Sequence, residues 1–290
     1  MNMPNKQIFS IGVDVGGSKI NAMLFDLRKN EIVRRQTIAT PKKKKKLLNQ
    51  LIQLIENVIA GVPKSRIAGI GLGIAGEIDF QKGILLNSPN LKFLNGTRPA
   101  RTVEKYFKLK TGMDNDANCF ALAEARLGAG RSFKNVVGIT LGTGVGGGIV
   151  INGSLYHGAF GSAGEVGWMI LDGTRTFEDL ASEKFIKSIS HESPINLEAK
   201  ARRGDKKALK VYETLGTNFG LGVANIINVL DPELIILGGG LASAAGLFLP
   251  QARKMAKKYI ISPLSRRKLK IVLAKLGKNA GAVGAALLCQ

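Results

Sequence analysis

The sequence has 290 residues and a net charge of +21, with 45% hydrophobic and 22% charged residues. This composition allows a packed core and excludes a disordered chain or a coiled coil. Two cysteines, Cys119 and Cys289, exclude a disulfide framework, and with only two histidines they leave too few ligands for a structural zinc site.

The start of the sequence lacks the apolar stretch of a signal peptide. No segment has the roughly 20 apolar residues that a membrane span requires. We therefore expect a cytoplasmic protein without a membrane partner.

The positive charge is concentrated in two segments. One is Lys42–Lys46, and the other follows Glu233, after which no acidic residue occurs. Attraction of a polyanion is one interpretation, and a solvated basic surface is the other. We favour the second because motifs, rather than net charge, decide function. Accordingly, no specific nucleic-acid partner is expected.

Apolar runs and their spacing predict alternating strands and helices. In the first part of the chain we expect strands at Ile8–Val15, Ile20–Leu27, Ile32–Ala39 and Ile67–Ala75, and helices at Leu47–Ala60, Thr102–Leu109 and Ala117–Leu127. In the second part we expect strands at Val136–Leu141, Ile149–Asn152, Leu234–Leu237 and Lys270–Ala274, helical structure from Glu178, helices at Lys206–Leu230 and Leu249–Tyr259, and an alanine-rich helix at the end.

A weak internal repeat favours an α/β fold with two similar halves. Ile11–Ile20 and Gly138–Gly147 both have the pattern of strand, glycine turn and strand. Such a duplication predicts two α/β lobes that face each other across a cleft.

Three glycine turns follow predicted strands, at Gly16–Lys19, Gly142–Gly148 and Gly238–Gly240. The N–H groups of such turns can converge on one anion, and glycine lets the backbone approach phosphate oxygens. Each turn alone is also typical of an ordinary tight connection, and none has the spacing of a Walker A or Rossmann motif. Asp14, just before the first turn, is a candidate ligand for a hydrated Mg²⁺.

Several polar residues have both a functional and a structural interpretation. Asp116 is a candidate general base with Asn115 on the substrate, or else a helix N-cap. Glu165 lies among glycines that would leave room for a ligand, although it is also typical of a turn. Glu178 is a candidate ligand residue or a first-turn helix acid, and Asn90 is by default a turn residue.

At these residues the sequence resembles the ROK family of sugar kinases and sugar-responsive repressors, within the actin-like and hexokinase ATPase superfamily. The resemblance covers Ile8 to Leu287 and rests on Leu141–Gly148 with Gly161–Gly167, on Asn115–Asn118 and on Asp14–Lys19. It implies an α/β fold of two duplicated actin-like (ribonuclease H-like) lobes around a central cleft. The expected domains are a small lobe over 1–117, a larger lobe over 118–277, and a terminal helix over 278–290 that packs back on the first lobe.

The resemblance also implies a role for each candidate residue. Asp116 falls on the catalytic base, and the residues expected to bind the sugar are Gly76, Asn90, Asn115, Glu165 and Glu178. The residues expected to bind ATP are Asp14, Gly16, Gly17, Ser18, Lys19, Thr140, Gly142, Thr143, Gly144, Gly239 and Gly240, and Asp14 is also the expected Mg²⁺ ligand.

The sequence departs from the family pattern at its zinc motif. Trp168 stands where family kinases usually carry a histidine, and the cysteine-rich loop is missing from Leu171–Phe177. We therefore expect ATP and Mg²⁺ as cofactors but no zinc. For Trp168 itself, core packing is favoured over contact with the sugar.

Together these features predict an ATP-dependent sugar kinase of carbohydrate metabolism and glycolysis, with glucose phosphorylated at its 6-hydroxyl. The alternatives are a kinase for N-acetylglucosamine, mannose or fructose, a glucokinase that uses inorganic polyphosphate, and a non-catalytic sugar-sensing protein. A family repressor is disfavoured, because the first strand begins near Ile8 and leaves no room for a winged helix-turn-helix. A homodimer is expected from the resemblance only.

Overall fold

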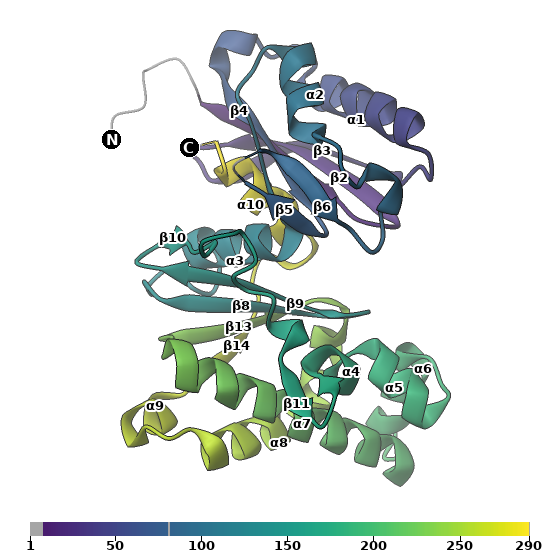
Figure 1. The fold of residues 1–290 in the computed structure, drawn as a ribbon, viewed down its shortest axis with the longest axis vertical. Coiled ribbons are helices and arrows are strands. Elements are labelled where there is room, and N and C mark those ends of the chain that lie inside the picture. The colour runs from purple at the N-terminus through teal and green to yellow at the C-terminus, as the bar shows by residue number, and fades with distance from the viewer. Residues whose placement is uncertain (1–7, 81, 290) are drawn as a thin grey trace. The chain divides into compact units, whose positions relative to one another are not determined.

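The computed structural model describes residues 8–80 and 82–289. The chain divides into two compact units, which are described separately (Figure 1). Unit 1 consists of Met1–Gly128, Leu155–Ala163 and Leu276–Gln290, and unit 2 consists of Ala129–Ser154 and Gly164–Lys275. The division into lobes that the sequence suggests stays a prediction.

Unit 1 is built on a five-stranded sheet with the order β3-β2-β1-β4-β7. The first three strands are antiparallel neighbours, and β4 and β7 run parallel to β1. The strands are β1 (Phe9–Val15), β2 (Lys19–Asp26), β3 (Glu31–Ala39), β4 (Ile67–Ile74) and β7 (Thr111–Asn115), with a separate hairpin of β5 (Glu77–Asp79) and β6 (Ile84–Asn87). The helices are α1 (Lys44–Ile59), α2 (Pro99–Phe107), α3 (Asp116–Leu127) and α10 (Ala280–Leu287).

The two faces of this sheet are covered in different ways. Successive side chains of a strand point to opposite faces. Ile11 and Ile70 therefore enter the hydrophobic core with the apolar residues of α1 and α2. Gly12 and Gly71 face α10, where a Cβ at either position would overlap a backbone carbonyl of that helix. These two glycines allow the backbone of α10 to lie directly on β1 and β4 (Figure 1).

Unit 2 repeats the same strand order, β10-β9-β8-β13-β14. Here β8 and β9 are antiparallel, and β13 and β14 run parallel to β8. The strands are β8 (Val136–Leu141), β9 (Val145–Ile151), β10 (Ser154–Leu155), β13 (Leu234–Gly238) and β14 (Ile271–Leu273), with a small hairpin of β11 (Ile170–Asp172) and β12 (Arg175–Thr176). The helices are α4 (Phe177–Ala181), α5 (Glu183–Ser190), α6 (Pro194–Arg202), α7 (Lys206–Leu230), α8 (Ala245–Tyr259) and α9 (Pro263–Lys268).

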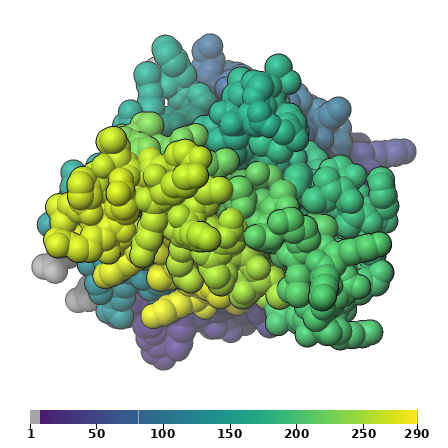
Figure 2. All heavy atoms as spheres, turned by 90° about the horizontal axis from the view of Figure 1, so that it is seen from below, coloured from purple at the N-terminus to yellow at the C-terminus, as the bar shows by residue number. Residues whose placement is uncertain are grey.

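Close helix packing organises the outer layer of unit 2. In Figure 2, α8 (yellow-green) lies along α7 (green), in agreement with their extensive contacts. A Cβ at Gly216 or Gly220 would lie 2.5 Å from the carbonyl oxygen of Phe248 or Ala252, respectively. The small residues on α7 therefore let the two helix backbones approach each other.

The α/β fold class and most of the predicted elements are confirmed. The long helix α7 and strand β8 have the predicted bounds, whereas β9 begins earlier than expected because its glycines continue the strand. The motif at Asn115–Asn118 predicts a strand-to-helix junction, but no bounds are predicted for its strand, β7, since Thr111–Asn115 lacks an apolar alternation. Among the described residues, no helix combines the length and the apolar character needed to cross a bilayer.

Candidate active site

The sheet of unit 1 brings its candidate polar residues to one edge. Strands β1, β4 and β7 are parallel, and their register places Asp14 beside Gly73 and Gly73 beside Asp114. Asp116 follows directly after β7, as the first residue of α3. The carboxyl ends of the three strands therefore gather Asp14, Asp114 and Asp116 at the same edge.

Burial raises the pKa of two of these carboxyl groups. Burial, together with the negative charge of Asp116, raises the pKa of Asp14 to about 7, and Lys19 opposes this shift. Burial also raises the pKa of Asp116, against the effect of a hydrogen bond from the amide of Ala117 (3.0 Å). Negative charge is therefore costly at this edge, and a bound cation would offset that cost.

Asn115, rather than Asp116, caps helix α3. The Oδ1 atom of Asn115 accepts hydrogen bonds from the amides of Ala117 (2.8 Å) and Asn118 (3.3 Å). Its Nδ2 donates to the carbonyl of Gly76 at 3.0 Å. The N-cap interpretation of Asp116 is therefore wrong, and capping does not explain why a carboxylate stands at that position.

In the turn between β1 and β2, the backbone carbonyls accept hydrogen bonds, whereas two backbone amides have no acceptor among the described residues. The carbonyl of Gly16 accepts a hydrogen bond from Thr40 Oγ1 (2.7 Å), and that of Ser18 accepts one from the Thr40 amide (3.0 Å). The carbonyl of Gly17 accepts one from Lys42 Nζ (2.6 Å). Within residues 8–80 and 82–289, no acceptor pairs with the amide of Gly17 or Ser18. These two N–H groups are thus available to an anion.

Asn90 and Gly76 lie at the same edge of unit 1. A Cβ at Gly17 would lie 2.7 Å from the Cβ of Asn90, so the turn packs against this residue. Gly76 has φ +140° and lies against Ser88, whose Oγ donates to the carbonyl of Ala75 at 2.6 Å. Unit 1 therefore brings both residues, together with Asn115, to the strand ends that carry Asp14 and Asp116.

Sequence reasoning missed a pair of a buried aspartate and a partly exposed histidine at this edge. Asp114 is buried, and its Oδ2 lies 2.7 Å from Nε2 of His157. Its Oδ1 accepts from the Asn118 side chain (2.8 Å) and the Asn115 amide (2.7 Å). The hydrogen bond to Asp114 raises the pKa of His157, whose ring also packs on Phe80 at 4.4 Å. Because the two partners are far apart in sequence, no local pattern indicates the pair.

In unit 2, two glycine turns lie side by side. Thr140 pairs with Gly238, so β8 and β13 end together. A Cβ at Gly142 would lie 3.7 Å from the amide nitrogen of Gly240. Gly239 has φ +88°, and a Cβ there would overlap the backbone of Leu141. The structure therefore brings together the turns at 142–144 and 238–240 that were expected to bind ATP.

Glu178 lies against the first of these turns. Its Oε2 accepts from the amide of Val145 at 3.1 Å, and its Oε1 pairs with Lys184 Nζ at 2.6 Å. The amide of Glu183, at the start of α5, donates to the carbonyl of Gly142 at 2.8 Å. Lys184 thus adds a cation near the turn that sequence reasoning did not identify. The sugar-binding role of Glu178 stays a prediction.

Glu165 and Trp168 are both exposed in unit 2. The neighbouring glycines allow close packing on β9: a Cβ at Gly164 would lie 2.8 Å from the Gly147 carbonyl, and one at Gly167 would overlap the Val145 carbonyl. These two glycines allow the backbone contact with β9, and the sugar-binding role of Glu165 stays a prediction. The side chain of Trp168 is 74% exposed, so the expectation of core packing is wrong.

No three histidine, cysteine or acidic side chains form a possible metal site in the part of the chain that the structure describes. Mg²⁺ needs no such cluster, because it commonly keeps several waters and binds one or two carboxylates together with substrate phosphates. Asp14 suits that mode of binding, since it lies near the end of β1, directly before the turn with the available amides of Gly17 and Ser18. The absence of zinc stays a prediction.

Comparison with known proteins is consistent with this arrangement. A family model described as the ROK family matches residues 10–290. The glucokinase of Halalkalibacterium halodurans is 33% identical, with coverage of 97% of this chain and 94% of that protein. The xylose repressor of Bacillus subtilis is 29% identical over 95% of this chain and 75% of the repressor.

The fold also matches a solved structure over nearly its whole length. The ROK family glucokinase from Streptomyces griseus, solved with glucose and AMPPNP, superposes with a TM-score of 0.82. It is 29% identical in sequence, and the match covers 97% of this chain and 98% of the other. The similarity therefore extends to both units.

Proposed function

The chain belongs to the ROK family, and from this premise we propose that it is an ATP-dependent hexose kinase that phosphorylates glucose at the 6-hydroxyl. One observation carries the proposal most directly. Asp116 is a partly buried carboxylate at the carboxyl end of β7, next to Asp14, and Asn115 takes over the capping of α3. A carboxylate placed in this way is available to accept a proton.

Asp116 would act as the general base. A sugar hydroxyl is a weak nucleophile, and transfer of its proton as the new P–O bond forms is favoured by a nearby carboxylate. Burial raises the pKa of Asp116 and so makes it a stronger base than an exposed aspartate. The hydrogen bond from Ala117 opposes this shift and favours the ionised form that accepts the proton.

Asn115 would orient the sugar. Both lone pairs of its Oδ1 are used by the amides of Ala117 and Asn118, and one N–H of its Nδ2 is used by Gly76. A side-chain amide has two N–H donors. The second N–H can therefore donate to a sugar oxygen, while the first fixes the direction of the group.

Each unit has a set of backbone N–H groups that would bind phosphate oxygens. In unit 1 these are the amides of Gly17 and Ser18. In unit 2 they are those of Thr143, Gly144, Gly239 and Gly240, whereas the amide of Gly142 donates to the carbonyl of Gly144 at 3.0 Å. Such groups are fixed before the donor arrives, so they stabilise developing charge without reorganisation. Asp14 would hold Mg²⁺, which, when bound, neutralises part of the phosphate charge.

A coupled assay of sugar phosphate formation tests the proposal, because this product forms with either phosphoryl donor. The full chain is assayed with ATP and Mg²⁺ against glucose, mannose, fructose and N-acetylglucosamine, and again with inorganic polyphosphate as the donor. We expect the highest kcat/KM with glucose and ATP. A higher value with another sugar or with polyphosphate would replace that part of the proposal. Sugar binding without turnover on any pair would instead indicate a sugar-sensing protein.

A further inference from the structure

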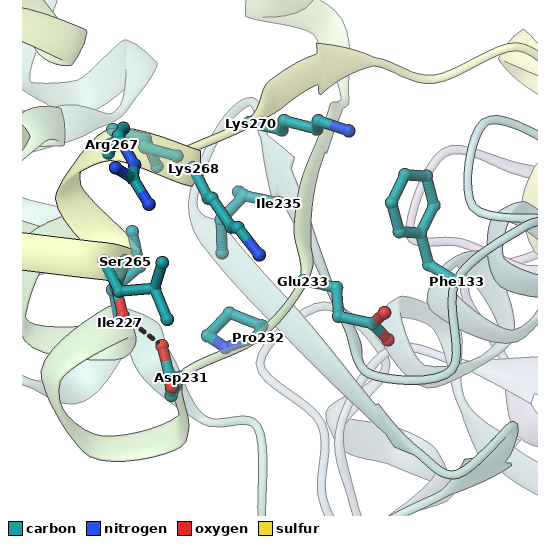
Figure 3. Close-up of a pocket in the computed structure, with 12 residues that line it drawn as sticks. Phe133, Ile227, Asp231, Pro232, Glu233, Ile235, Ser265, Arg267, Lys268 and Lys270 are labelled. Atoms are coloured by element: carbon teal, nitrogen blue, oxygen red, sulfur yellow. Dashed lines mark hydrogen bonds between the residues drawn. The ribbon is translucent and has the colours of Figure 1, made fainter.

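A hollow of about 640 Å³ lies in unit 2, outside the residues discussed above. Small-molecule sites commonly have roughly 300–1,000 Å³. The hollow is lined by the end of α7, the segment that leads into β13, and α9 with the residues after it (Figure 3). It is therefore large enough for a compound of mononucleotide size.

The hollow lies at the end of the sheet opposite to the glycine turns. Glu233 and Lys270 line it and directly precede β13 and β14, whereas Gly239 and Gly240 follow the other end of β13. Strand β13 has five residues, and a rise of about 3.3 Å per residue places its ends roughly 15 Å apart. A ligand here would be separate from one held by the turns of unit 2.

Three cations line one side of the hollow. Arg267, Lys268 and Lys270 stand along its upper side in Figure 3. None of the three forms an ion pair with an acidic group of the described residues. Lys270 Nζ instead lies 5.1 Å from the ring centre of Phe133. Their charges are therefore available to an anionic ligand.

Two acids on the other side are held by neutral donors. Asp231 Oδ1 accepts from Ser265 Oγ at 2.6 Å, as the dashed line in Figure 3 marks. Glu233 Oε2 accepts from the amides of Lys134 and Asn135, both at 2.8 Å. These bonds fix the acids in place, and their remaining oxygen lone pairs can accept hydrogen bonds from a ligand.

Apolar groups lie between the charged sides. Ile227 and Ile235 are buried, and they line the hollow together with Pro232. Leu264 is 52% exposed and borders the same space. A ring placed here would bury apolar surface and so gain binding free energy.

From this arrangement we propose that the hollow binds a phosphate monoester whose ring carries hydroxyl or amino groups. The phosphate would pair with Arg267 and Lys268, because guanidinium and ammonium groups form strong charge-assisted hydrogen bonds with phosphate oxygens. The ring would lie on Ile235 and Pro232, and its hydroxyl or amino groups would donate to Asp231 and Glu233. A nucleotide and a sugar phosphate both have this chemistry. The inference does not depend on the proposed function.

Calorimetric titration of the full chain tests the inference. The probes are AMP for the nucleotide source and glucose 6-phosphate for the sugar source, with inorganic phosphate and adenosine as partial ligands. The site variant is Arg267→Glu/Lys268→Glu. The matched control is Lys206→Glu/Lys207→Glu, an equal change of charge on two exposed lysines of α7 in the same unit.

We expect at least one ester to bind with an affinity that falls about tenfold or more in the site variant, and that stays unchanged in the control. The affected ester identifies the source. Binding that both variants keep belongs to a different site, including the site of the proposed kinase activity, so the two proposals fail independently. The inference is overturned if neither ester loses affinity in the site variant, if the control loses as much, or if inorganic phosphate binds as tightly as the esters.

Discussion

Units 1 and 2 have the same strand order but different residues at the strand ends. Asp14 is the last residue but one of β1, and Thr140 holds the same place in β8. The neighbouring parallel strands of unit 1 end at Ile74 and Asn115, and Asp116 follows the second of them. In unit 2, β13 ends at Gly238 and is followed by Gly239 and Gly240. The sheet fixes the positions of the strand ends. A carboxyl residue at a strand end can exchange a proton, whereas a glycine turn there can bind an anion through its backbone N–H groups.

The largest effect is expected from removing the proposed general base at the strand ends of unit 1. Asp116→Asn should lower kcat by about 10²–10⁴-fold, because the amide cannot accept the proton, and should leave the KM for sugar nearly unchanged. Steady-state kinetics measure both values. Glu104→Gln, on the exposed face of α2, is the control and should behave as the wild type. If Asp116→Asn keeps most of the wild-type kcat, Asp116 is not the general base, and the proposed functional difference between the two units is contradicted.

A smaller effect is expected from a substitution in the glycine turn after β13 of unit 2. Gly239→Ala should lower the free energy of unfolding by roughly 1–3 kcal/mol, because its φ of +88° is unfavourable for alanine and its Cβ would overlap Leu141. The KM for ATP should rise as well. Gly246→Ala is the matched control: it lies in α8 with open space around it, and should stabilise by about 0.5–1 kcal/mol. Denaturant unfolding distinguishes the two, and equal stabilities would show that the turn tolerates a side chain.

Glu178 tests whether the strand ends of unit 2 bind sugar as well as the donor. Glu178→Ala should raise the KM for glucose about tenfold and change the KM for ATP less, because a sugar hydroxyl loses its acceptor. Glu213→Ala, an exposed acid on α7, is the control. Equal increases in both KM values would instead assign Glu178 to the turn that it contacts through Val145.

The smallest effect concerns the pair of Asp114 and His157. The hydrogen bond to Asp114 raises the pKa of His157 above its unfolded value near 6.5. The stabilisation from this shift is therefore complete below about pH 6.5 and is lost as the pH rises through the folded pKa. His157→Gln should remove this part of the pH dependence of unfolding. His191→Gln, at the only other histidine, should retain it, and identical pH profiles for the two variants would contradict the pairing.

Much of the fold follows from the sequence, because long apolar patterns such as that of α7 depend on local residue spacing. Short polar elements escape such reasoning: β7 has one buried residue, Asp114, and its place in the sheet is set by pairing with β4. The glycine turns were found because each follows an apolar strand. Tertiary contact alone brings 142–144 next to 239–240.

The candidate site was predicted in part. The motif at 115–118 predicts a strand-to-helix junction with Asp116 as a general base or as the helix N-cap. Only the direction of the side chains shows that Asn115, and not Asp116, caps the helix. The pair of Asp114 and His157 joins segments far apart in sequence, and Lys184 approaches Glu178 only because α4 and α5 are folded against each other. Trp168 shows the opposite error, since a hydrophobic residue was assigned to the core and is exposed.

The packing of α10 on Gly12 and Gly71 has a consequence for the order of events during synthesis. Unit 1 includes residues 276–290, which leave the ribosome after the whole of unit 2. Domains generally fold as units while the chain grows. The face of β1 and β4 that α10 covers therefore stays uncovered by α10 while unit 2 is synthesised and can fold. Unit 1, although it begins first, is completed last.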